Sequence, residues 1–146
     1  MSIFVDENET FPLDVWYTEN RDESGRLRSL DVATEPHEGW LHIRGHFCQP
    51  GAEAFGVILE GSTIINHMSF KPLLQTRLLR DLVLLKLMRS WATVDDSDET
   101  ETPLPHDQKT LAKTHWQITN HLFVSYMAET KMEAAIEVAI EEETSQ

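Results

Sequence analysis

One segment constrains the fold more than any other: the run from Phe70 to Trp91, which carries eight leucines and five basic side chains. Apolar residues recur in it at spacings of three and four, the period of one face of an α-helix. The residues that share this face are Leu74, Leu78, Leu82, Leu85 and Met88. Other leucines and Trp91 widen the apolar face beyond what the core of a small domain needs. We therefore predict one helix whose surplus apolar surface binds a partner.

The first third of the chain has the pattern of short strands. Residues 14–18, 28–33 and 39–47 are rich in aromatic and branched side chains and are separated by turn-like segments. In the third of these, apolar residues alternate with polar ones, which predicts an antiparallel sheet with one polar face. The residues expected on that face are His42, Arg44 and His46.

The rest of the chain has helical periodicity. Residues 53–60 are compatible with a strand or a helix, and Pro50 before them with Gly61 after them favours the helix. Residues 95–105 are acidic and contain proline, which predicts a surface loop, and a helical pattern resumes at Asp107. The expected fold class is α+β, with a small N-terminal antiparallel sheet followed by a mostly helical C-terminal two-thirds.

The length of 146 residues favours a single domain over residues 1–146. We expect a β-rich part in residues 1–49, a helical part in residues 50–143 and a frayed acidic tail in residues 141–146. The alternative for the apolar helix is that it and the C-terminal helix simply cover each other and the sheet, as an α+β core requires.

The formal net charge of -13 argues against binding to nucleic acid or to an anionic membrane, since both attract positive protein surfaces. The single cysteine, Cys48, excludes an internal disulfide and favours the cytoplasm. The N-terminus has no signal-peptide pattern. Arg77, Arg80 and Asp81 would be costly in hydrocarbon, so the leucine-rich segment is not expected to span a membrane.

Catalytic patterns are weak. Metal sites need clustered ligands, but His42 and His46 are spread along a predicted strand, while His115 and His121 are about 240° apart on a helix. The chain has no G-x-S-x-G elbow and no glycine loop for phosphates. Cys48 is expected to be a small buried apolar side chain. We predict no enzyme activity, no cofactor and no metal, but a protein that binds another protein.

Residues 79–130 resemble the C-terminal half of the tail assembly chaperones encoded by long-tailed bacteriophages. The shared features are a helix that ends in tryptophan, an acidic turn, a proline-apolar pair, a short helix and a last helix with tyrosine and alanine. Here they correspond to Trp91, residues 95–99, Pro103 with Leu104, residues 107–111, and Tyr126 with Ala128. Upstream, residues 41–59 resemble the family's basic strand and the proline-led helix that follows it.

The resemblance implies a cytoplasmic assembly factor that coats a long helical client, such as a tape-measure protein, as a homodimer or larger homo-oligomer. Alternatives are a structural subunit of a phage-like tail or particle and an acidic effector chaperone of a bacterial secretion system. In each case the expected protein-binding residues are the apolar face of the leucine-rich helix and the acidic loop after it. They are Leu74, Leu78, Leu82, Leu85, Met88, Trp91, Asp95, Asp96, Asp98 and Glu99.

Overall fold

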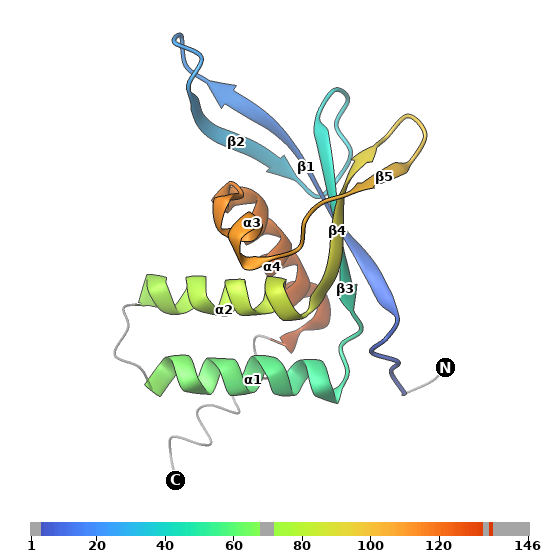
Figure 1. Cartoon of the computed structure of the whole chain (residues 1–146), viewed down its shortest axis with the longest axis vertical. Coiled ribbons are helices and arrows are strands. Elements are labelled where there is room, and N and C mark those ends of the chain that lie inside the picture. Colours follow the sequence, from blue (N-terminus) through green and yellow to red (C-terminus); the bar gives the residue numbers. More distant parts are fainter. Residues whose placement is uncertain (1–3, 68–71, 133–134, 136–146) are drawn as a thin grey trace.

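The computed structural model describes residues 4–67, 72–132 and 135 (Figure 1). Three strands come first, two helices follow, two strands return to the sheet, and two helices come last. In order, these are β1 (Thr10–Arg21), β2 (Leu27–Ala33), β3 (Leu41–Cys48), α1 (Ala52–His67), α2 (Pro72–Lys86), β4 (Met88–Asp95), β5 (Thr100–Pro103), α3 (Gln108–Lys113) and α4 (Trp116–Thr130). The three predicted strands and the helix after Pro50 are confirmed. The predicted acidic tail, residues 141–146, lies outside the described residues.

The prediction of a mostly helical C-terminal two-thirds is wrong, although the chain is α+β. The leucine-rich helix ends at Lys86, and residues 88–103 form β4 and β5 instead of a helix end and a loop. Trp91 lies opposite Gly45 of β3, and Thr93 lies opposite Ile43. Pairing satisfies the backbone groups along the free edge of β3 and buries Trp91, whereas a continued helix would leave that edge unpaired. Tertiary pairing therefore overrides the local helical pattern.

All five strands form one antiparallel sheet in the order β2-β1-β3-β4-β5. In Figure 1 the helices α2, α3 and α4 lie on one side of this sheet, and no element in the described part of the chain covers the other side. Helix α4 packs against β1 and β2, and α2 packs against both α4 and β4. The sheet therefore has one face that forms the core and one open face.

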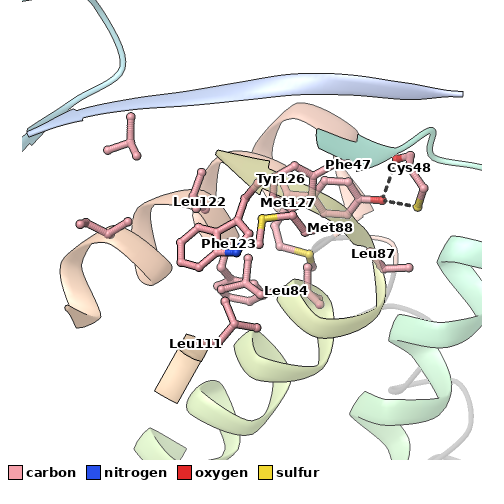
Figure 2. Packing of buried hydrophobic residues seen from close by; sticks show 14 of the residues in the cluster. Phe47, Cys48, Leu84, Leu87, Met88, Leu111, Leu122, Phe123, Tyr126 and Met127 are labelled. Atoms are coloured by element: carbon pink, nitrogen blue, oxygen red, sulfur yellow. Dashed lines mark hydrogen bonds between the residues drawn. The ribbon is translucent and has the colours of Figure 1, made fainter. Parts of the chain in front are cut away.

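The core lies between the sheet and the helices (Figure 2). The ring of Tyr126 stacks on that of Phe47 at 4.9 Å between centroids, and its hydroxyl lies 3.4 Å from the Cys48 carbonyl oxygen. Cys48 is fully buried, as predicted. A Cβ atom on Gly45 would lie 2.8 Å from both Met88 Sδ and the Phe47 ring, so this position has room only for glycine.

The helices have clear local signals. The carboxylate of Asp107 accepts a hydrogen bond from the Thr110 amide at 2.7 Å and caps α3. The side-chain amide of Gln117 binds both the amide and the carbonyl of Leu30, at 2.8 and 2.7 Å, and so fixes α4 to the edge strand β2. Among the described residues, no helix has the length and apolar character needed to cross a membrane.

Candidate functional site

The open face of the sheet carries a cluster of charged side chains from three strands and one turn. Alternation along β3 places His42, Arg44 and His46 on this face, as predicted, while Ile43 and Phe47 point into the core. The register of the sheet sets Asp14 of β1 directly opposite Arg44. The members of this open-face cluster are Asp14, His42, Arg44, His46, Asp96 and Glu101.

His42 lies at the centre of the open-face cluster, with its side chain only 2% exposed. Its Nε2 atom is 2.7 Å from Oδ1 of Asp14, and its Nδ1 atom is 2.6 Å from Oδ1 of Asp96. Each ring nitrogen of His42 is therefore engaged with a carboxylate oxygen from a different part of the chain. One face of this ring stacks on Trp16 at 4.0 Å between centroids. Because neither nitrogen is free, His42 is not available as a general base.

Asp96 ties the turn between β4 and β5 to the sheet. Its second carboxylate oxygen accepts a hydrogen bond from the indole of Trp16 at 2.9 Å. This bond is the largest cause that lowers the pKa of Asp96, and the hydrogen bond and charge of His42 lower it further, against a smaller cost of desolvation. Asp96 therefore ionises more readily in the folded protein than in the unfolded chain. Its contacts with Trp16 and His42 hold the β4–β5 turn against the sheet.

The outer half of the open-face cluster extends across β3 to β5. Arg44 donates from Nε to Asp14 at 2.7 Å, and its Nη1 lies 3.7 Å from Glu101. His46 Nε2 lies 2.6 Å from Glu101, and this hydrogen bond is the largest cause that lowers the pKa of Glu101. Every member of the cluster therefore has a hydrogen-bond or ion-pair partner within the cluster.

A groove of about 1020 Å³ lies next to the open-face cluster. One wall is the loop of residues 34–40 between β2 and β3, where Gly39 has a φ of 80° that permits the turn, and the opposite wall is the β4–β5 turn. The floor includes His42 and Trp16, and Trp40 is stacked on His37 at 4.1 Å. Residues of this open-face groove are Trp16, Pro36, His37, Glu38, Gly39, Trp40, Leu41, His42, Arg44, Val94, Asp95, Asp96, Ser97 and Glu99.

The predicted acidic residues have different tasks in the β4–β5 turn. Asp95 accepts from the amide and hydroxyl of Ser97, at 3.0 and 2.6 Å, and Asp98 accepts from the Thr100 amide at 3.0 Å. These two side chains build the turn. Glu99 is exposed, makes no hydrogen bond or ion pair within the described chain, and has a φ of 58°, a left-handed conformation that few non-glycine residues adopt. Of the four predicted residues, only Asp95, Asp96 and Glu99 line the groove.

The predicted apolar binding residues divide into two groups. Leu74 and Leu85 are 39% and 38% exposed, and Leu78 and Leu82 are half-buried, so these four form a leucine stripe on α2. A hollow of about 310 Å³ beside Leu78, Leu82 and Leu85 is lined by residues of both α2 and α3. By contrast, Met88 and Trp91 are 0% and 3% exposed in the core. These last two cannot contact a partner while the domain is folded.

The alternation of β3 was enough to place three cluster residues on one face of the sheet. No local sequence signal identified the residues that lie near them, which include Asp14, Trp16, Glu38 and Glu101. Asp96 is 54 residues from His42 in the chain, and only the return of β4 brings them together. Among the described residues, no group of three or more histidine, cysteine or acidic side chains is arranged to hold a metal ion.

Comparison of the chain with family models, with curated proteins and with solved structures finds no match. The likeness to tail assembly chaperones therefore rests on the residues described above. One of its elements is corrected by the fold, since Trp91 lies in strand β4 instead of ending a helix. The two helices that follow the acidic turn are present as α3 and α4.

Proposed function

We propose that this protein is a non-catalytic protein-binding factor that shields a client during the assembly of a larger particle. The open-face groove is its contact surface, and a segment of the client with basic and apolar side chains is its ligand. The observation that carries this proposal is that one groove contains two indoles, Trp16 and Trp40, together with Glu38 and Glu99 on opposite walls, whose carboxylates make no hydrogen bond or ion pair within the described chain.

The charge of the groove indicates which charge its ligand should carry. Glu38 and Glu99 make no hydrogen bond or ion pair within the described chain, whereas Arg44 and His42 are already paired with carboxylates. The free charge of the groove is therefore negative. A lysine or arginine side chain would gain from these carboxylates and from the indole faces, and the net charge of -13 adds a long-range attraction for basic partners.

The leucine stripe of Leu74, Leu78, Leu82 and Leu85 is a second surface, on the helical layer instead of the open face. A client helix could lie along it through the same three- and four-residue spacing, or a second copy of the chain could cover it in the homodimer expected above. The groove needs neither event in order to bind a short basic segment. The two surfaces are therefore tested separately.

Within this class, the tail assembly chaperone suggested by the resemblance is our leading hypothesis, with a cytoplasmic location and a helical, tape-measure-like client. It is expected to bind neither nucleic acid nor membranes. A permanent structural subunit and an acidic effector chaperone are the alternatives. A monomer or dimer that keeps a helical client from aggregating supports a chaperone, while closed rings that form without a client support a structural subunit.

The groove is tested with two synthetic peptides of equal length that share the same leucines and carry either lysines or glutamates. Calorimetry on the whole protein should show binding of the lysine peptide only, weakening with salt. The E38Q/E99Q variant should bind it at least fivefold more weakly. The matched control is E23Q/E129Q, which removes the same charge from exposed sites outside the groove. Equal affinities for both peptides, or equal affinities of the two variants, would contradict the proposal.

A further inference from the structure

A second, chemically opposite pocket lies in the helical layer, away from the open-face groove. It has a volume of about 390 Å³ and is formed by the middle of α2, the end of α3 and the first turn of α4. Two arginines, Arg77 and Arg80, line it in a chain whose net charge is -13. The residues of this arginine pocket are Arg77, Arg80, Asp81, Leu111, Ala112, Thr114, Trp116 and Thr119.

Arg80 has unused hydrogen-bonding capacity. Its side chain is only 16% exposed, and its buried Nε atom has no hydrogen-bond partner. The nearest carboxylate, Oδ1 of Asp81, is 3.5 Å from that nitrogen, which permits attraction but no hydrogen bond. Buried polar groups without partners are uncommon and costly in native structures. Arg77 also makes no ion pair or hydrogen bond within the described chain, and both arginines line the same pocket.

The start of α4 adds a third source of positive potential. The ring Nδ1 of His115 accepts from the Gln117 amide at 3.1 Å, but the first-turn amide of Trp116 has no acceptor within a helix. The hydroxyls of Thr114 and Thr119 already donate to backbone carbonyls, at 2.8 and 3.2 Å. Donors for a ligand are therefore the two guanidiniums and the helix start, opposed by the single charge of Asp81.

We infer that the arginine pocket binds a phosphate group carried by an aromatic or other planar moiety. A carboxylate has two oxygens, whereas a phosphate offers three to the two guanidiniums and the helix amide, and its second negative charge outweighs Asp81. The indole of Trp116, 62% exposed, forms the wall on which the attached planar group would stack. This inference is independent of the peptide groove, because no residue is shared between the two sites.

The test is calorimetric titration of the whole protein with inorganic phosphate, phenyl phosphate and acetate at low ionic strength. Phosphate is expected to saturate one site, phenyl phosphate to bind severalfold more tightly, and acetate to bind most weakly. R77Q and R80Q should each weaken phosphate binding at least tenfold, while R80K, which keeps the charge, should lose less. The W116A variant should remove only the advantage of phenyl phosphate.

The matched control is R26Q, which removes one exposed cation from the β1–β2 turn and should bind as the unmodified chain does. Circular dichroism of each variant separates lost binding from lost folding, and the exposed Arg77 keeps the test open if R80Q does not fold. Absence of saturable phosphate binding, or equal affinities of R77Q and R26Q, would overturn the site. Tighter binding of acetate than of phosphate would overturn the choice of ligand.

Discussion

The Nδ1 atom of His42 lies 2.6 Å from Oδ1 of Asp96, which joins the centre of the sheet to a turn 54 residues later in the chain. Since the other ring nitrogen lies 2.7 Å from Asp14, the ring of His42 bridges two carboxylates from different parts of the chain. Together with the Trp16 indole, His42 therefore holds the β4–β5 turn, and with it one wall of the open-face groove, against the sheet.

Replacing His42 by alanine should therefore lower the free energy of unfolding by about 2–3 kcal/mol. Removing one partner of a buried ion pair costs more than this, but the carboxylates of Asp14 and Asp96 are 23% and 48% exposed, so water compensates for part of the loss. Urea denaturation measures the change. The exposed His37 is the control, and its replacement by alanine should cost less than about 1 kcal/mol. Equal losses at both positions would show that the two hydrogen bonds of His42 add nothing.

Lowering the pH should reduce the stabilisation that the carboxylates of the open-face cluster give to the fold. The pKa values of Asp96 and Glu101 are lowered in the folded state, chiefly by hydrogen bonds from Trp16 and His46. Unfolded chains therefore bind protons more readily at these sites. The resulting stabilisation is complete above the ordinary pKa values of 3.8 and 4.5 and is lost as the pH falls through the lower folded values.

Unfolding free energies measured at a series of pH values below 5 should thus fall less steeply in a D96N/E101Q variant than in the unmodified protein. The matched control is E23Q/E129Q, whose carboxylates make no hydrogen bond or ion pair within the described chain. If the D96N/E101Q and control curves have the same slope in this range, the two carboxylates do not contribute to acid stability as inferred.

Gly45 should tolerate no side chain. A Cβ atom there would come within 2.8 Å of Met88 Sδ and the Phe47 ring, and both residues are completely buried, so neither can move away freely. We expect Gly45→Ala to destabilise the fold by about 1–3 kcal/mol through overpacking. Gly56 in α1 has nothing within 4 Å of such a Cβ, and its replacement by alanine should stabilise the helix by up to about 1 kcal/mol. Thermal unfolding of the two variants should shift in opposite directions.

Replacing Glu99 should change the stability of the fold and the affinity for the lysine peptide in opposite directions. Its φ of 58° disfavours glutamate, whereas asparagine tolerates this left-handed conformation. We expect Glu99→Asn to raise the free energy of unfolding by about 0.5 kcal/mol and to weaken binding of the lysine peptide severalfold, because the groove loses one carboxylate. Calorimetry and denaturation of one preparation give both values. A variant that is more stable and binds equally well would exclude Glu99 from the contact surface.

Local sequence patterns predicted secondary structure correctly where the conformation of a segment follows from its own residues. The alternation in β3 correctly placed His42, Arg44 and His46 on one face, and Pro50 and Gly61 correctly favoured a helix between them. Local patterns gave the wrong element for Met88 and Trp91. The helical spacing of the leucines continues into this segment, but the segment pairs with β3 as a strand. The periodicity of a single segment does not indicate that it will pair with a strand much earlier in the chain, as β4 pairs with β3.

The candidate site divides in the same way. Acidic residues between 95 and 99 stood out by composition alone. Composition did not distinguish Asp95 and Asp98, which build the turn, from Asp96, which binds His42, or from Glu99, which makes no hydrogen bond or ion pair in the described chain. Hydrogen-bond geometry made that distinction.

The amino-acid sequence by itself determined the strands of the first third, the polar face of β3, the burial of Cys48 and the net negative charge. Only the tertiary structure decided that residues 88–103 join the sheet, that Trp16 and His42 meet Asp96, and that Arg77 and Arg80 share a pocket with Trp116. The reason is physical: periodicity and charge are properties of neighbours in the chain, whereas long-range pairing is selected by the burial and hydrogen bonding of the whole fold.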